Sequence, residues 1–260
     1  MPVRREPGDG WAPVIRAVTV DCWGTLLLDG PGSDDRYRRQ RLRGIRTILA
    51  RTGVTVSQAD LDRAYIDSGR RLARIWQRRR DVPVSAHVTA VLDALDPELP
   101  DRLPSGIVAE LWDAYTSPAL RVPPEVDAGA GAALEALRAR GLVLGLVSNT
   151  MRTPGTVLRR IFDRVGLLAP FRVLTFSDEC GIRKPDPEIF LLTLRRLGVS
   201  PEEAIHVGDD PVLDVEGARD AGMGGVIQVS ADGRATGPVS PDAVIRRLDE
   251  LLAALDGLAS

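Results

Sequence analysis

The chain has 260 residues, of which 44% are hydrophobic and 27% are charged, and its formal net charge is −2 at pH 7. This ordinary globular balance predicts no overall attraction to nucleic acid or to anionic membranes. No apolar stretch approaches the ~18–20 residues of a membrane span, and the N-terminus lacks a signal-peptide pattern. We therefore expect a cytoplasmic protein with no membrane partner, in which Cys22 and Cys180 are reduced.

The first predicted element is a buried strand over residues 14–23, which runs into VTVDCWGTLLLD and places Asp21 near its end. Residues 31–126 then show long helical patterns and no convincing strand. An all-helical insertion after the first strand predicts a cap over the strand ends. The length of the chain agrees with a core of residues 1–30 and 127–260 that carries such an insertion.

The second half of the chain alternates short apolar runs with amphipathic segments. Runs at 143–150, 171–176, 204–210 and 224–230 are typical of buried parallel strands. Helical patterns lie between them, for example at 130–141 and 187–198, and a polar loop at 230–242 precedes a final helix. This alternation predicts an α/β fold with a doubly wound parallel sheet, whose ligands bind at the carboxyl ends of the strands.

Two features of the basic residues indicate a role in binding. Residues 34–80 contain 14 Arg against 5 Asp, so this part of the insertion is either a solvated face or a positive lid that attracts anionic substrates. No aromatic interleaving accompanies these arginines, and no nucleic-acid partner is expected. Lys184 is the only lysine in the chain, and its compact ammonium differs chemically from the planar guanidinium used everywhere else. We expect Lys184 to act in the site.

Polar residues gather where several predicted strands end. A carboxylate can act as a nucleophile, and hard oxygen ligands without thiolates or paired histidines suit Mg²⁺, which usually shares its site with a phosphate. Amide and hydroxyl donors with a lysine can neutralise the transferring oxygens. The residues with these properties are Asp21, Ser148, Asn149, Lys184, Asp209, Asp210 and Asp214.

Four stretches together resemble the motifs of the haloacid dehalogenase superfamily, in the branch with a helical cap. DCWGTLLLD resembles the first motif, DxDGTLxD, and LVSNT resembles the second. SDECGIRKPDPEIF and HVGDDPVLDVEGARDAGM resemble the third and fourth, and the resemblance covers residues 14–230. It implies a Rossmann-like core and a hydrolase that acts on a small anionic, phosphorylated metabolite.

The resemblance also implies a role for each matching residue. Asp21 would be the nucleophile that forms a covalent aspartyl intermediate, and Thr25 would orient its loop. Ser148, Asn149 and Lys184 would hold the transferring group. The Mg²⁺ ligands would be Asp21, the backbone carbonyl of Trp23, and Asp209, with Asp214 in support.

Trp23 departs from the first motif, because the family's phosphatases carry an aspartate there as general acid and base. An indole cannot transfer this proton, and general acid–base catalysis is worth about 10²–10⁴-fold in rate. Three interpretations stay open: an Mg²⁺-dependent phosphohydrolase or phosphoryl-transfer enzyme with an atypical or absent acid, a 2-haloacid dehalogenase-like enzyme, and a non-catalytic binder of a phosphorylated ligand or a protein partner. The acidic cluster favours the first, because carboxylates without a cation would repel one another.

Other groups are weighed as substitutes for the missing acid. Asp29 stands at the exit to the cap, where structural capping is the simpler role, and His87 is expected to be a surface residue that could swing over the site. His206 is expected to pack in the core. The sequence leaves open whether the protein is a monomer or a homodimer.

Overall fold

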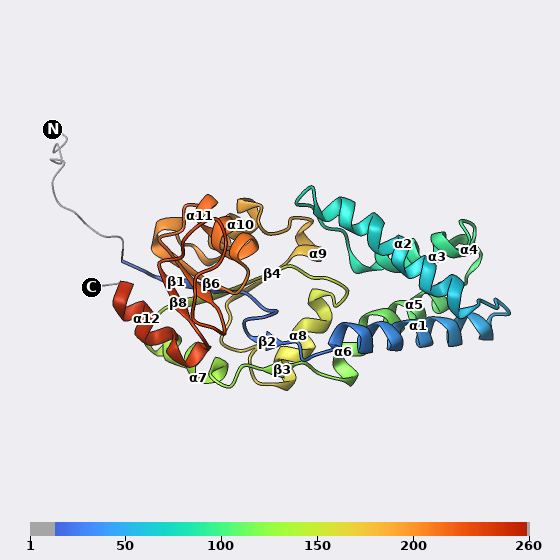
Figure 1. The fold of residues 1–260 in the computed structure, drawn as a ribbon, viewed down its shortest axis with the longest axis horizontal. Coiled ribbons are helices and arrows are strands. Elements are labelled where there is room, and N and C mark those ends of the chain that lie inside the picture. Colours follow the sequence, from blue (N-terminus) through green and yellow to red (C-terminus); the bar gives the residue numbers. More distant parts are fainter. Residues whose placement is uncertain (1–13, 259–260) are drawn as a thin grey trace.

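The computed structural model describes residues 14–258, so the predicted absence of a signal peptide concerns residues outside this range. Its core is a six-stranded parallel sheet in the order β5-β4-β1-β6-β7-β8 (Figure 1). The predicted α/β class with a parallel sheet is therefore confirmed. The strands are β1 (Ala17–Val20), β4 (Val143–Ser148), β5 (Val173–Phe176), β6 (Ala204–Gly208), β7 (Gly225–Val229) and β8 (Ala243–Ile245).

Helices cover both faces of the sheet, as a doubly wound fold requires. Helices α7 (Ala130–Ala139), α8 (Gly155–Arg164) and α12 (Leu251–Leu258) share one apolar cluster with the strands. Helices α10 (Pro187–Leu197) and α11 (Gly217–Asp220) contribute to the cluster on the other face. Because both faces are covered, β6 and β7 are buried along their whole length, which explains their continuous apolar pattern.

The prediction for the C-terminal part misses the edge strand β8. The polar loop at 230–242 leads first into β8, whose Ala243 pairs with Ile227 of β7, and only then into α12. A strand of three residues is too short to show a period-two pattern, so its pairing comes from the tertiary structure.

A helical insertion, which we define as Ser33–Arg121, separates the first two strands from the rest of the core (Figure 1). It has its own apolar core, built mainly from α1, α2, α3 and α5. The flanking strands β2 (Leu27–Leu28) and β3 (Glu125–Val126) pair antiparallel and bring its two ends side by side. Its helices are α1 (Ser33–Arg51), α2 (Gln58–Trp76), α3 (Val84–Leu95), α4 (Leu99–Arg102), α5 (Ser105–Thr116) and α6 (Pro118–Arg121).

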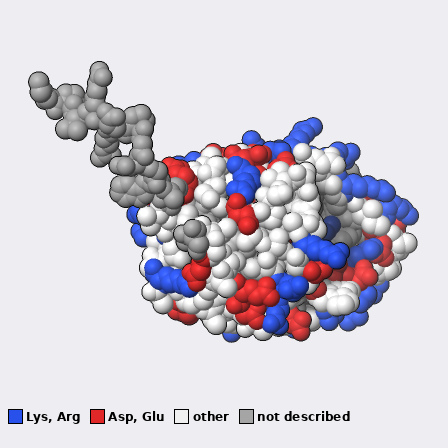
Figure 2. All heavy atoms as spheres, turned by 60° about the vertical axis from the view of Figure 1, so that its left-hand side comes forward, with Lys and Arg blue, Asp and Glu red and all other residues white. Residues whose placement is uncertain are grey.

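The surface agrees with the small net charge. On the face drawn in Figure 2, acidic and basic side chains are interspersed rather than separated into large fields of one sign. Among the helices of residues 14–258, none combines the length and the apolar character needed to cross a membrane.

His87 is not the surface residue that the sequence predicts. It is 0% exposed in the core of the helical insertion, where its ring meets Trp76 and Tyr115 edge-on at centroid distances of 6.2 Å. Neither ring nitrogen has a hydrogen-bond partner among the described residues. Burial lowers the pKa of His87 to about 4, although the nearby Asp81 carboxylate opposes this shift. His87 is therefore a neutral packing residue.

This burial predicts acid sensitivity. Because the folded pKa of about 4 lies below the ordinary 6.5, the unfolded chain binds more protons between these values, and stability falls as the pH falls through that window. We expect the free energy of unfolding to drop by about 2 kcal/mol more in the wild type than in His87→Phe between pH 7 and pH 5. Urea denaturation at both pH values measures this difference, and equal pH dependence of the two proteins would contradict it.

Candidate active site

The sheet order brings the predicted site residues to one edge. Strand β1 lies between β4 and β6, and Val20 is in register with Leu146 and with Val207. The next residue, Asp21, donates its backbone N–H to the carbonyl of Val207 at 2.9 Å. Asp21, Ser148 and Asp209 therefore lie at the carboxyl ends of three adjacent strands, with β4 on one side of β1 and β6 on the other.

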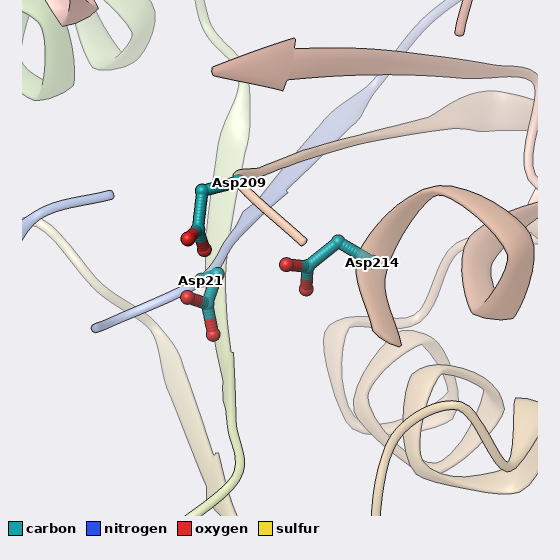
Figure 3. A group of neighbouring side chains, drawn as sticks. All are labelled: Asp21, Asp209 and Asp214. Atoms are coloured by element: carbon teal, nitrogen blue, oxygen red, sulfur yellow. The ribbon is translucent and has the colours of Figure 1, made fainter. Parts of the chain in front are cut away.

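Three carboxylates converge at this edge (Figure 3). One oxygen each of Asp21, Asp209 and Asp214 lie within 4.8 Å of one another. Asp214 is carried by a π-helical turn, Pro211–Glu216, which follows β6. The Asp210 carboxylate begins this turn by accepting from the N–H groups of Val212 and Leu213, both at 2.8 Å. Asp210 thus caps the turn and presents Asp214 to the other two carboxylates.

Two glycines make room for these carboxylates. A Cβ at Gly208 would lie 2.3 Å from Cγ of Asp214, and a Cβ at Gly24 would lie 2.2 Å from Oδ2 of Asp209. Gly24 also has φ +80°, which side chains other than glycine rarely adopt. The glycines of the first and fourth motifs are thus spatial requirements of the acidic cluster.

Lys184 lies between two of the carboxylates and is 3% exposed. Its ammonium donates to Asp21, and to Oδ1 of Asp214 at 2.6 Å. Its backbone is held from both sides by the side chain of Asn149, which accepts from the Lys184 N–H at 2.8 Å and donates to the Lys184 carbonyl at 3.0 Å. The Asn149 side chain therefore positions Lys184, whereas the sequence predicted that it would hold the transferring group.

Asp214 also contacts the buried His206, which in turn contacts Thr19, and the sequence did not reveal the role of either side chain. His206 Nε2 lies 3.0 Å from Asp214 Oδ1, and His206 Nδ1 lies 2.8 Å from the hydroxyl of Thr19. Because an ionised carboxylate only accepts hydrogen bonds, Nε2 carries the proton and the Thr19 hydroxyl donates to Nδ1. Thr19 and His206 are paired between β1 and β6. This pairing would have predicted the arrangement, but it can be recognised only when the order of the strands in the sheet is known.

The site holds more negative than positive charge. Burial raises the pKa of Asp21 to about 8 against the attraction of Lys184, and Asp214 and Asp209 raise it further. Burial and Asp214 raise the pKa of Asp209 to about 6. For Asp214, burial acts upward, but the Lys184 ammonium and His206 outweigh it and hold the pKa well below its usual range. Three acidic side chains share one ammonium, so a cation at this edge would be stabilised and would favour their ionised forms.

The free donor and acceptor groups fit a cation and an oxyanion. The Asp209 side chain accepts no hydrogen bond from another residue in the range 14–258, which leaves it available to a metal such as Mg²⁺. The hydroxyls of Thr25 and Ser148 are buried and have no hydrogen-bond partner among the described residues. A buried hydroxyl without a partner is costly, and an anionic oxygen of a ligand would satisfy it.

Cys22 lies beside this site but has no reactive character. Burial raises the pKa of its thiol well above the ordinary value, and the Asp21 carboxylate adds to this shift. The thiol therefore stays protonated, and the side chain belongs to the apolar cluster under the sheet.

Trp23, which stands where the first motif has its second aspartate, is a packing residue. Trp23 is partly buried against the apolar cluster of the core, and its backbone bridges to Leu27. Asp29 is exposed and makes no hydrogen bond or ion pair with another described residue. The N-cap residue of α1 is Gly32, which offers no side-chain cap, so the predicted capping role is wrong. His87 is enclosed in the helical insertion and does not have the placement of a general acid.

Fold and site together define an α/β protein with an acidic cluster and a buried lysine at the carboxyl ends of a parallel sheet. The model of the haloacid dehalogenase-like hydrolases matches residues 15–222. The chain belongs to this hydrolase family.

Individual relatives carry different activities. The chain is 28% identical over 247 residues to a phosphoglycolate phosphatase of Shigella boydii, covering 93% of this chain and 92% of the relative. It is 40% identical over 116 residues to a phosphoserine phosphatase of Thermus thermophilus, a match that covers 44% of each chain. For the first curated relatives the chain thus spans about half of their length, 44% for the Thermus protein and 53% for a haloacid dehalogenase-like hydrolase domain-containing protein 3 of Danio rerio.

Solved structures show the same division. A 2-haloacid dehalogenase from Pseudomonas syringae is 27% identical, with a TM-score of 0.69 over 94% of this chain and 99% of that one. A phosphatase of this family from Thermococcus onnurineus is 28% identical, with a TM-score of 0.58 over the same shares. Choosing between these chemistries therefore depends on the residues of the site.

The contact between Gly24 and Asp209 yields a prediction with a matched control. Gly24→Ala introduces both a strained φ and a collision with the carboxylate, whereas Gly32→Ala introduces a strained φ of +73° with no atom within 4 Å. We expect Gly24→Ala to lower the free energy of unfolding by about 1–3 kcal/mol more than Gly32→Ala does. Urea denaturation of both variants measures this, and equal losses would show that Asp209 moves aside freely.

Proposed function

We propose that the protein is an Mg²⁺-dependent phosphohydrolase or phosphoryl-transfer enzyme that acts through an aspartyl-phosphate on a small phosphorylated metabolite. The observation that carries this proposal is the excess of carboxylate charge at the strand ends, beside two buried hydroxyls that lack partners. Such a site is suited to a divalent cation together with an oxyanion. The phosphatase names of several relatives support the same class.

Each residue would then have a defined task. Mg²⁺, held by Asp21, the backbone carbonyl of Trp23, and Asp209 with Asp214 in support, would neutralise charge on the phosphoryl oxygens. Thr25 and Ser148 would donate their free hydroxyls to those oxygens. Lys184 would add its ammonium from the Asp21 side. Asn149 would keep the Lys184 backbone in place.

The reaction would proceed in two displacements. An oxygen of Asp21 forms a bond to phosphorus while the bond from phosphorus to the leaving oxygen breaks, and that oxygen takes the electron pair. Water then attacks phosphorus, the Asp21 carboxylate is regenerated, inorganic phosphate leaves, and a proton passes to solvent. Because Trp23 supplies no acid, we expect leaving groups that need no proton to react fastest.

We further propose that residues 31–126 form a cap over the core of residues 1–30 and 127–260. The separate apolar core of the helical insertion and the paired strands β2 and β3 at its base support this division. The arginines of this segment would favour the approach of an anionic substrate.

One observation favours a second candidate function. Trp23 replaces the residue that would protonate a leaving group, and a halide leaves without a proton. The fold is also similar to that of a 2-haloacid dehalogenase. A carbon-centred hydrolysis would use the same nucleophile, Asp21, but would leave the excess carboxylate charge without a partner.

A turnover assay with three substrates separates these functions. We expect release of phosphate from acetyl phosphate, slower release from p-nitrophenyl phosphate and no chloride release from 2-chloropropionate. Turnover should require Mg²⁺ and be lost in Asp21→Asn, which removes the nucleophile but keeps the shape of the side chain. Chloride release without metal would overturn the proposal in favour of the dehalogenase, and activity in Asp21→Asn would refute the nucleophile.

Restoring the missing acid gives an independent prediction. Trp23→Asp should raise the hydrolysis of an unactivated alkyl phosphate by about 10²-fold, because the introduced carboxyl can protonate the leaving oxygen. It should change acetyl phosphate turnover little, since that leaving group needs no proton. Steady-state kinetics on both substrates measures the ratio. An unchanged ratio would show that proton transfer does not limit this site.

A further inference from the structure

A buried ion pair joins the helical insertion to the segment that carries Lys184. Asp81, just after α2, is 7% exposed, and Arg183 is 6% exposed. Arg183 Nη1 donates to Asp81 Oδ2 at 2.8 Å, and the hydroxyl of Ser177 donates to the same oxygen at 2.5 Å. The other oxygen accepts from Trp76 Nε1 and from the Val82 N–H, both at 2.9 Å. Four donors therefore fix the Asp81 carboxylate.

The backbones of the two segments also pair at this point. Arg80 and Ile182 form an antiparallel bridge, in which Asp81 donates its N–H to the carbonyl of Gly181 at 3.1 Å. On the other side, the Arg183 N–H donates to the carbonyl of Arg79 at 3.2 Å. Arg79 holds a left-handed φ of 57°, which a non-glycine residue adopts only where its surroundings enforce it. The insertion is thus clamped directly onto residues 181–183.

From this clamp the contacts continue into the active site. Arg183 immediately precedes Lys184, its guanidinium lies 4.4 Å from the ring centroid of Trp76, and its Nη1 also donates to the carbonyl of Thr150 at 2.9 Å. The Thr150 N–H in turn donates to the Ser177 hydroxyl at 2.8 Å. Asn149, the neighbour of Thr150, holds the Lys184 backbone. The ion pair is therefore connected to Lys184 by two routes. One is the peptide bond between Arg183 and Lys184, and the other runs through Thr150 and Asn149.

We propose that Asp81 is a positioning residue, which acts through Arg183 to place Lys184 only when the helical insertion is docked on the core. The catalytic consequence of this inference rests on the proposed function, because Lys184 acts on the transferring group only if that function holds. The placement of the Lys184 segment itself is a property of the free protein and is measurable without substrate or metal.

Simple stabilisation is a weak explanation for this ion pair. Replacing both members of a buried pair by apolar groups is often neutral or stabilising, whereas removing one member leaves an uncompensated charge. The two kinds of variant therefore separate stability from positioning. Asp81→Asn removes the charge but keeps the shape, and Asp81→Asn with Arg183→Met removes both charges while an apolar side chain remains against Trp76.

Hydrogen exchange of the full-length protein tests the placement directly. In Asp81→Asn we expect peptides that cover residues 177–186 to exchange about tenfold faster than in the wild type, with peptides from α1 and α5 unchanged. Asp93→Asn is the matched control, because it removes a carboxylate from the exposed pair of α3 with Arg71 in the same insertion, where the side chains are 34% and 61% exposed. It should leave residues 177–186 as protected as in the wild type.

The double variant decides between positioning and plain structure. We expect its melting temperature to return toward the wild-type value while residues 177–186 stay rapidly exchanging. On acetyl phosphate with Mg²⁺, kcat should stay about tenfold below the wild-type value and KM should change less than kcat, because Lys184 stabilises charge that develops in the transition state.

Recovery of both melting temperature and protection in the double variant would overturn the inference, as would wild-type protection in Asp81→Asn. A wild type without Mg²⁺-dependent turnover would refute the proposed function alone, since the exchange experiment uses neither substrate nor metal.

Discussion

The buried ammonium of Lys184 is the constraint on which the site depends. A charge that is 3% exposed persists only among opposite charges and fixed hydrogen bonds. Asp21 and Asp214 supply the charges, and Asn149 fixes the backbone. Asp214 in turn is oriented by the neutral imidazole of His206. The glycines beside Asp209 and Asp214 follow from the same requirement, because any side chain there would displace a carboxylate.

The fold meets this requirement by placing rigid elements around one point. Parallel strands end at the same edge, so residues from β1, β4 and β6 meet there without long connecting loops. The π-helical turn after β6 turns Asp214 back toward Lys184. The helical insertion closes the arrangement from the other side, through the buried pair of Asp81 and Arg183. Buried ion pairs thus occur both at Asp21 and at the junction between the core and the insertion.

The chemistry follows from the balance of charges rather than from the fold. Three carboxylates against one ammonium favour an additional cation, and the free hydroxyls of Thr25 and Ser148 favour an oxyanion. Trp23 acts in the opposite direction, because it removes the proton donor that phosphate esters of poor leaving groups need. The phosphoryl-transfer enzyme that we propose, selective for good leaving groups, would satisfy both observations, and the helical insertion would select its substrate.

The sequence by itself determined the α/β class, five of the six strands of the parallel sheet and the convergence of Asp21, Asp209 and Lys184 at one edge. These features are encoded locally, in apolar runs, strand ends and motifs. The tertiary structure decided the burial of His87, the bond from His206 to Asp214 and the short strand β8. It also decided the contacts of Asp81 with Ser177 and Arg183, which lie 96 and 102 residues away along the chain. Contacts over such separations depend on how the helical insertion packs against the core. Periodicity and local motifs report only which face of an element is apolar, so they do not predict that packing.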